Sequence, residues 1–341
     1  MSRFLTVGAA AAFGAAFHSF RSSQQMVAEC ASQKEVFTGK FQPFVLGEVI
    51  NLAEDVAVFR FLMNDPNDEF NLVPCSTLQA HFKEGTNIVD KPMRFYTPIT
   101  SNGTKGYFDL LVKKQRPGRF TEHLFGMNVG ETLLFRVLQY KLTYKKDRWS
   151  EVGFIAGGTG LCPILQFMNA SLETPRDKTK MRCLFANRSE NKILLKGMLD
   201  EKARKHKDRL QMFYTVDKLD DPNTIPNPAY TKGKRLDLDI SAQPETSPDG
   251  KKYFHGFVGH IDVPMLQATM PPPSDKTLVL VCGPDMMMVK VVGAAPNMLK
   301  AMSSGLAYQP SGAVLNNAAD VSGYLGSLGF TKDYGVSLLK T

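Results

Sequence analysis

The ten residues Phe154–Pro163 read FIAGGTGLCP, and they decide the fold class of the second half of the chain. An apolar run leads into three closely spaced glycines, Gly157, Gly158 and Gly160, and an apolar helical pattern follows. A strand that turns sharply into a helix needs glycine, and such a turn brings helix N-terminal amides close to a phosphate. The same residues are equally compatible with a tight turn that binds no ligand. The ordinary dinucleotide fingerprint is not met, because Pro163 replaces its last glycine and no acid follows on a second strand about 20 residues later.

Similar apolar runs follow this stretch as far as the C-terminal region. EVGFIAGG, MRCLFAN, RLQMFYTV and KTLVLVCGP are continuous apolar runs, and stretches with helical spacing such as NKILLKGMLDEKARKHKD separate them. Strands that alternate with helices predict a parallel sheet covered on both faces. We therefore assign residues 149–341 to an α/β domain, in which Lys218–Lys252, rich in Pro, Asp and Lys, is expected to form a long surface loop.

The region before this domain has a different pattern. FVLGEVINLAEDVAVFRFLM, GYFDLLVKK and ETLLFRVLQY are short β-branched and aromatic runs broken by turns. Several such strands at close spacing predict an antiparallel barrel or sandwich. We assign it to residues 33–148, so the chain is predicted to hold two domains.

Composition sets wide limits on function. The 341 residues are 43% hydrophobic and 22% charged, as in an ordinary folded protein, and the formal net charge is +8. This charge suits an acidic partner, an anionic membrane or nucleic acid, and a solvated basic surface explains it as well. The five cysteines form no C-x-x-C pair, so neither a disulfide framework nor a metal site is expected.

The N-terminal segment, residues 1–32, differs from the rest. It contains Arg3 and Arg21, no acid before Glu29, and an apolar Ala/Gly/Phe run from Phe4 to about Phe17. That run is short for a membrane span, which needs roughly 17–25 apolar residues. A mitochondrial presequence, a retained anchor and a secretory signal are the three interpretations, and the basic, acid-free composition favours mitochondrial delivery. An anchor in the endoplasmic reticulum membrane is the alternative location.

Three motifs in order resemble one family. They are RFYTP in the barrel region, IAGGTGLCP at the glycine turn, and VLVCGP, which places Cys282–Pro284 at the end of another parallel strand. Together with GYFDLLVKK, LLFANRSENKILL and GFVGHIDVPMLQATMPPP, they resemble the NADH–cytochrome b5 reductase family of the ferredoxin–NADP reductase superfamily. The resemblance runs from about Val36 to the C-terminus, and DVSGYLGSLGFTKDYGV is similar to fungal and protist membrane-anchored mitochondrial members.

The resemblance implies an FAD site in the barrel domain. The family's arginine of R-x-Y-T binds the flavin diphosphate, its tyrosine packs along the isoalloxazine, and its threonine lies near the reactive edge. The implied FAD-binding residues are Arg94, Phe95, Tyr96, Thr97, Lys113 and the GRFT turn of Gly118, Arg119, Phe120 and Thr121. Guanidinium suits phosphate, and a phenol offers an apolar face with a polar tip. Alternation along a strand places Arg94 and Tyr96 on one face.

The resemblance also implies an NADH site in the α/β domain. Its implied residues are Gly158, Thr159, Cys162, Asp217, Cys282, Gly283 and Pro284. A carboxylate at Asp217 would bond the ribose hydroxyls and repel a 2′-phosphate, which favours NADH over NADPH. Arg188 and Lys192 leave a second interpretation open, because they could neutralise such a phosphate if they point inward. For Cys282, packing beside the nicotinamide is favoured over a nucleophilic role, since hydride transfer needs no thiolate.

The function implied is that of an FAD-dependent NADH–cytochrome b5 reductase, with Tyr96, Thr97 and Cys282 at the reacting centre. A cytochrome b5-like haem protein or another one-electron acceptor, a membrane and a mitochondrial membrane complex are the expected partners, and no nucleic acid is expected. Phe95 in place of the family's proline, and the ending GVSLLKT in place of an aromatic terminus, keep an accessory subunit with weak turnover as the alternative. Tyr308 and Tyr334 are candidates to replace the missing ring.

Overall fold

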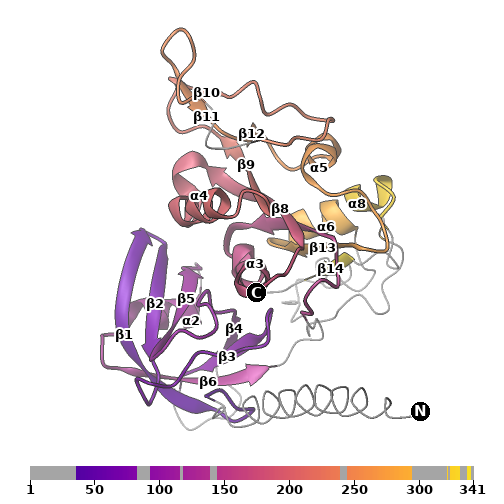
Figure 1. Ribbon diagram of the computed structural model, residues 1–341. Coiled ribbons are helices and arrows are strands. Elements are labelled where there is room, and N and C mark those ends of the chain that lie inside the picture. Colours follow the sequence, from indigo (N-terminus) through magenta and orange to yellow (C-terminus); the bar gives the residue numbers. More distant parts are fainter. Residues whose placement is uncertain are drawn as a thin grey trace, which may run out of the picture. The chain divides into compact units, whose positions relative to one another are not determined.

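The computed structural model describes residues 36–82, 93–115, 118–138, 144–238, 244–293, 321 and 323–330, and the backbone of 336–338 (Figure 1). Six strands form an antiparallel sheet in the order β4-β3-β6-β1-β2-β5. Their bounds are β1 (Gln42–Ala53), β2 (Val56–Leu62), β3 (Thr77–His81), β4 (Met93–Tyr96), β5 (Tyr107–Lys113) and β6 (Thr132–Leu138).

Phenylalanines fill the interior of this sheet. Phe44 of β1, Phe61 of β2, Phe108 of β5 and Phe135 of β6 are each at most 1% exposed. The rings of Phe61 and Phe135 lie 4.9 Å apart, centroid to centroid, in an edge-to-face arrangement, and those of Phe44 and Phe108 lie 5.2 Å apart. Such rings meet only if the sheet curls around them, and the pairing adds to their burial. The predicted antiparallel barrel is thus confirmed.

The two edge strands of the barrel, β4 and β5, carry the sequence motif and its neighbour. Directly after β4, the amide of Ile99 donates to the carbonyl of Asp109 in β5 at 2.9 Å. The Asp109 amide in turn donates to the hydroxyl of Thr100 at 2.7 Å. These bonds tie the end of β4 to β5. The helix α2 (Arg119–Gly126) follows β5.

The second sheet is parallel throughout, in the order β12-β9-β8-β7-β13-β14. Its strands are β7 (Glu151–Gly157), β8 (Lys180–Ser189), β9 (Leu210–Lys218), β12 (Phe257–Val258), β13 (Thr277–Cys282) and β14 (Val336–Leu338). Its described α-helices are α3 (Leu161–Glu173), α4 (Lys196–Lys205), α5 (Val263–Thr269), α6 (Asp285–Val292) and α8 (Tyr324–Ser327). The strand order reverses between β7 and β13, and at such a switch point a crevice opens beyond the carboxyl ends of the strands.

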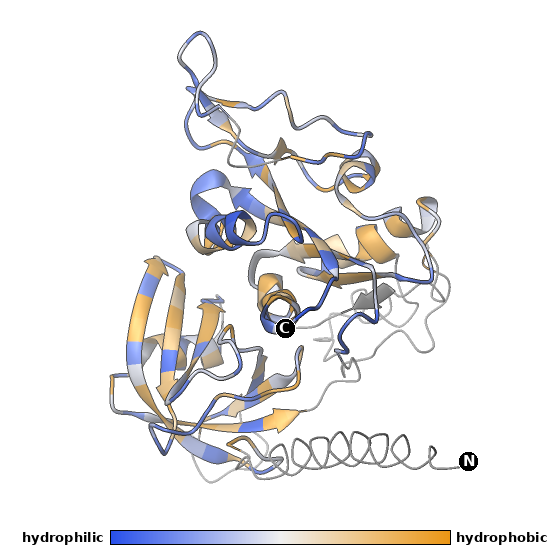
Figure 2. Ribbon diagram, viewed as in Figure 1, coloured by the Kyte–Doolittle hydropathy of each residue, from blue (hydrophilic) through white to orange (hydrophobic). Residues whose placement is uncertain are grey.

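Helices cover both faces of the parallel sheet (Figure 1). On one face, α3 and α4 pack on side chains such as Phe154 and Phe185; on the other, α5, α6 and α8 pack on side chains such as Ile155 and Val281. Figure 2 shows that α4 is largely hydrophilic and α6 largely hydrophobic. A strand buried on both faces must be apolar at every position, which explains the continuous apolar runs of the sequence.

One expectation about the loops needs refinement. Lys218–Lys252 was expected to be a surface loop, but it contains the strand β10 (Thr224–Pro226), which pairs in parallel with β11 (Lys252–Phe254). The N-terminal segment 1–32, Tyr308 and Tyr334 lie outside the described residues. Within the described part of the chain, no helix is long and apolar enough to span a membrane, and no cluster of His, Cys, Asp and Glu could hold a metal ion.

Candidate functional site

The strand β4 presents the R-x-Y-T side chains at the edge of the barrel. Arg94 pairs in register with Ala80 of β3, and Tyr96 pairs with Leu78. Because successive residues of a strand alternate, Arg94 and Tyr96 share a face and Phe95 points to the other, where it is 37% exposed. The Arg94 guanidinium donates to the carbonyl of Met93 at 2.8 Å and pairs with no acid in the described part of the chain.

Tyr96 connects β4 to the GRFT turn. Its ring lies 5.8 Å from that of Phe120 in α2, centroid to centroid. Burial raises the pKa of the Tyr96 phenol, and the charge of Arg94 offsets part of this rise. The phenol is therefore neutral at physiological pH. The two halves of the expected FAD site, β4 and the start of α2, are in contact.

Thr97 ends the motif in a buried position. It is 3% exposed, and its hydroxyl lies 3.5 Å from that of Thr77 at the start of β3. A buried hydroxyl held by another hydroxyl can donate or accept one further hydrogen bond. This is the polar group that the resemblance assigns to the flavin's reactive edge.

The GRFT turn forms the start of α2, with Gly118 as its N-cap. The hydroxyl of Thr121 is already engaged, because it accepts from the Gln115 amide at 3.1 Å and donates to the Gly118 carbonyl at 3.0 Å. The first amides of a helix have no partner within the helix, so they are the groups available to a phosphate. Arg119 is exposed on the same turn.

Lys113 ends β5 and pairs with an acid. Its ammonium lies 3.5 Å from the Asp55 carboxylate, and both side chains are about one third exposed, at 35% and 39%. An exposed pair of this kind is worth little, on the order of 0–1 kcal/mol, so Lys113 can exchange partners easily.

The glycine turn and the Cys-Gly-Pro turn interlock at the switch point. The 3₁₀ turn Gly158–Gly160 links β7 to α3, and a Cβ placed on Gly160 would lie 2.3 Å from the carbonyl oxygen of Cys282. A Cβ on Gly283 would lie 3.1 Å from the amide nitrogen of Gly157. The two backbones therefore touch, which side chains at these positions would prevent.

The outer side of the glycine turn is open. Gly158 has φ +54°, in the left-handed region that favours glycine, and a Cβ there would meet nothing within 4 Å. Thr159 is half-buried beside it. Open space at the start of α3, at the carboxyl edge of the parallel sheet, is what a nucleotide diphosphate requires. The residues present fit such a ligand.

The two cysteines of this region are both buried. Cys162 in the first turn of α3 is 2% exposed, and burial raises the pKa of its thiol to about 12. Cys282, at the end of β13, is 1% exposed. A thiol kept protonated by an apolar environment is a poor nucleophile. For Cys162, packing is the role that the structure supports.

Asp217 lies at the exposed carboxyl end of β9, two strands from the glycine turn. Its side chain is 46% exposed and its carboxylate oxygen lies 3.1 Å from Nδ1 of His260, itself 78% exposed. Arg188, at the end of β8, and Lys192 are exposed. All three are therefore reachable by a nucleotide, and the choice between a ribose hydroxyl and a 2′-phosphate stays a prediction.

Two further residues were missed by sequence reasoning. Gln166 and Asn169 lie in α3, where their amides contact the segment after β4. The only signal in the sequence is a pair of amides three residues apart in an otherwise apolar helix, LCPILQFMNASLE.

Comparison with protein families identifies the class. Residues 43–144 match the model of the oxidoreductase FAD-binding domain, and residues 154–234 match that of the oxidoreductase NAD-binding domain. The fold agrees with solved structures. The cytochrome b5 reductase domain of Ulva prolifera nitrate reductase aligns at TM-score 0.57 and 26% identity, covering 82% of this chain and 98% of that one. A ferredoxin NADP⁺ reductase from Neisseria gonorrhoeae with bound FAD and NADP, 12% identical, aligns at 0.54 over 88% and 98% of the chains and shows the fold alone.

Curated relatives narrow the class further. NADH-cytochrome b5 reductase 1 of Debaryomyces hansenii is 30% identical over 310 residues, which are 90% of this chain and 91% of the relative. NADH-cytochrome b5 reductase 2 of Homo sapiens is 31% identical, over 71% of this chain and 84% of the relative. The chain belongs to the NADH–cytochrome b5 reductase family, and it is an oxidoreductase whose cofactors are FAD and NADH.

Proposed function

We propose that this protein takes a hydride from NADH onto FAD and passes the electrons singly to a haem protein of the cytochrome b5 type. The names of its relatives support the donor and the acceptor. One structural observation carries the proposal: Val58 and Leu111 of the barrel share a single hydrophobic cluster with Phe154 and Cys162 on either side of the glycine turn. The barrel and the elements that flank the glycine turn are thus parts of one packed core.

The barrel residues bind and orient the flavin. When bound, FAD accepts a hydride and can give up its two electrons one at a time. Arg94 would pair with the diphosphate, and the amides at the start of α2 would contact it as well. Tyr96 would supply an apolar wall whose phenol stays neutral, and the buried hydroxyl of Thr97 would be available to the flavin's reactive edge.

The residues of the parallel sheet hold the nucleotide. The backbone of Gly158 and Thr159 would contact the diphosphate, and Asp217 would accept hydrogen bonds from the adenosine ribose. Cys282, Gly283 and Pro284, which lie in close contact with the glycine turn, would pack beside the nicotinamide. Cys282 has no covalent role in this scheme.

Basic side chains near the connection between the two sheets face the acceptor. Lys145, Lys146 and Arg148 are exposed, and a haem domain with an acidic surface would be steered towards them. Lys141 lies outside the described residues. Steering by exposed charges is screened by salt, so cytochrome reduction should slow with ionic strength while flavin reduction by NADH changes less.

The N-terminal segment, residues 1–32, would deliver the protein to mitochondria and hold it in a membrane. Its composition supports this: arginines flank an apolar run and acids are absent before Glu29. Expression of the full chain with a C-terminal tag, followed by cell fractionation and carbonate extraction, tests the location. Recovery with the endoplasmic reticulum would favour the alternative, and recovery in the soluble fraction would contradict anchoring.

Anaerobic titration of the purified protein with NADH tests the function. Bleaching of an FAD spectrum at one NADH per flavin, followed by reoxidation with cytochrome b5, is the expected result. An FAD spectrum that NADH leaves unchanged would instead support an accessory subunit that keeps the flavin for its structure. The same titration with ferricyanide separates loss of the acceptor surface from loss of hydride transfer.

A further inference from the structure

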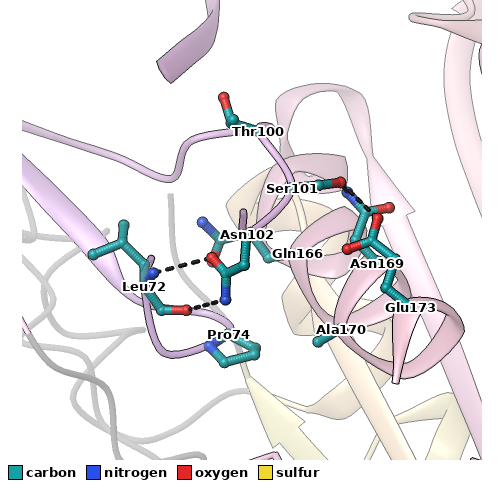
Figure 3. A pocket seen from close by; sticks show the side chains of 9 residues that line it. All are labelled: Leu72, Pro74, Thr100, Ser101, Asn102, Gln166, Asn169, Ala170 and Glu173. Carbon is teal, nitrogen blue, oxygen red and sulfur yellow. Dashed lines mark hydrogen bonds between the residues drawn. The ribbon is translucent and has the colours of Figure 1, made fainter. Parts of the chain in front are cut away.

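One face of α3 forms hydrogen bonds with the segment that follows β4 (Figure 3). Gln166, Asn169 and Glu173 are spaced three and four residues apart, so they lie on the same side of the helix. The side-chain nitrogen of Gln166 donates to the Pro98 carbonyl at 3.0 Å, and that of Asn169 donates to the Ser101 hydroxyl at 2.9 Å. The Ser101 hydroxyl in turn donates to the Glu173 carboxylate at 2.8 Å.

These bonds join the two cofactor half-sites directly. Pro98 follows Thr97 in the chain, and α3 begins where the glycine turn ends. Gln166 stands six residues beyond Gly160, about 9 Å along a helix axis at roughly 1.5 Å per residue. A helix is stiff over that length, so any tilt or slide of α3 against Pro98 moves the glycine turn relative to Thr97.

A small cavity lies within this contact. Its volume is about 20 Å³, and its lining includes Thr100, Asn102, Gln166 and Asn169 (Figure 3). Gln166 and Asn169 are 6% and 5% exposed, and in the described part of the chain their side-chain oxygens, Oε1 and Oδ1, are buried without a hydrogen-bond partner. Native proteins rarely leave two such acceptors unsatisfied at one place.

The cavity has the size and chemistry for one water molecule. A water needs roughly 10–15 Å³ and two to four polar partners. The two unsatisfied groups are both acceptors, and a water has two hydrogens to donate. A water in this cavity can therefore donate to one of these oxygens, which would stiffen the contact.

We propose that Gln166 and Asn169 are positioning residues that hold the glycine turn, and with it the bound nucleotide, at the correct distance from the flavin-binding strand. This inference rests on the proposed function for its kinetic consequence. Reacting atoms must approach within roughly 3–3.5 Å, and a displacement of about 1 Å far from the chemistry can lower a rate by about 10²-fold.

The first experiment compares Gln166→Leu with the wild type in stopped-flow flavin reduction. The leucine keeps most of the volume and removes both the donor to Pro98 and the acceptor. We expect the rate constant at saturating NADH to fall by about 10–100-fold, while the Kd for NADH and the FAD content stay unchanged. Gln267→Leu, the same change at an exposed position of α5, is the matched control and should behave as the wild type.

The second experiment needs no bound cofactor. Hydrogen–deuterium exchange of the apoprotein should speed up in residues 98–102 and 158–161 of Gln166→Leu, and stay unchanged in Gln267→Leu. If Gln166→Leu fails to fold, Asn169→Ala serves for both measurements. A high-resolution crystal structure should show a water in the cavity, within hydrogen-bond distance of Gln166 Oε1 or Asn169 Oδ1, and an empty or apolar-filled cavity would overturn the water's part in the contact.

The outcomes separate the two proposals. A wild type that NADH reduces, together with a Gln166→Leu variant of unchanged rate and unchanged exchange, overturns the positioning role and leaves the proposed function standing. A wild type that NADH does not reduce overturns the proposed function. In that case faster exchange in both segments would still support the contact between the two half-sites, and unchanged exchange would contradict it.

Discussion

The two proposed cofactor half-sites differ in the groups that they would offer to a ligand. On β4 the groups are side chains on an edge strand: Arg94 is exposed, and among the described residues only the carbonyl of its neighbour Met93 accepts a hydrogen bond from it. At the switch point the groups are backbone, and Gly160 and Cys282 leave no space for an added methyl group. Substitution of a side chain on β4 should therefore weaken ligand binding and leave the stability of the fold unchanged. Substitution at the glycine turn should weaken both ligand binding and the stability of the fold.

The largest expected effect is at Gly160. In Gly160→Ala the new Cβ would lie 2.3 Å from the Cys282 carbonyl oxygen, where backbone opposes backbone and cannot rotate away. We expect a loss of about 3 kcal/mol or more in the free energy of unfolding, at the upper end of overpacking effects. Urea unfolding of the apoprotein measures it.

Gly158→Ala is the matched control for that change. Its Cβ meets nothing within 4 Å, so only the left-handed φ of +54° opposes the alanine. That costs about 1–2 kcal/mol. Equal losses at the two glycines would show that conformation, and not the contact between the two turns, limits this site.

Next in size is the loss of flavin from Arg94→Ala. Removing a charge-assisted contact with the diphosphate should weaken FAD binding by about 1.5–3 kcal/mol, while urea unfolding of the apoprotein stays as in the wild type. Flavin released during gel filtration and a fluorescence titration with FAD measure the change. The FAD affinity of Arg94→Lys should lie between that of the wild type and that of Arg94→Ala, because a lysine keeps the charge and loses the fork geometry of the guanidinium. Full retention of flavin in Arg94→Ala would remove Arg94 from the site.

A smaller effect is expected on the choice of nucleotide. Asp217→Thr removes a hydrogen bond to NADH and a repulsion against the 2′-phosphate, so kcat/KM should fall for NADH and rise for NADPH. The ratio should move by at least about tenfold, since 1.4 kcal/mol corresponds to a factor of ten. Stopped-flow flavin reduction with each nucleotide measures it without an acceptor. An unchanged ratio would show that Asp217 is not at the ribose, and Arg188 would be tested next.

The smallest effect concerns two buried thiols, one before β3 of the barrel and one beside the glycine turn. Burial raises the pKa of Cys162, beside the glycine turn, to about 12 and also raises that of Cys75, before β3. At pH 8 both are protonated, and neither should react with iodoacetamide in the native protein. Mass spectrometry of the labelled peptides follows each thiol over time. Labelling of Cys75 well before Cys162 would show that the barrel opens independently of the parallel sheet.

Much of the fold could be predicted because burial on both faces leaves a clear pattern. The continuous apolar run in β13 indicates a central parallel strand by itself. The strand β3 shows no such pattern. Three residues of its sequence TLQAH are polar, and yet every residue is buried. Its Gln79 is satisfied by Arg136 of the neighbouring strand β6, a partner 57 residues away that no local pattern reveals.

For the candidate site, too, local patterns could be predicted and contacts between distant segments could not. Alternation along a strand was enough to place Arg94 and Tyr96 on one face. The engagement of Thr121 within its own turn, and the bond from Gln166 to Pro98, depend on how distant segments pack. The period of a helix says which side chains share a face, and it cannot say which loop that face meets.

The position of β13 beside β7 has a consequence for synthesis of the protein. The barrel and the strands β7, β8 and β9 all precede residue 219, whereas β13 begins at residue 277. At roughly 5–20 residues per second, the ribosome makes the intervening chain over several seconds. Until then β7 is a temporary edge strand, apolar on both faces and with one row of backbone groups unpaired, which is the kind of surface that invites aggregation. A chaperone that binds nascent chains would be most useful to this protein in that interval, after the barrel has formed and before the parallel sheet can close.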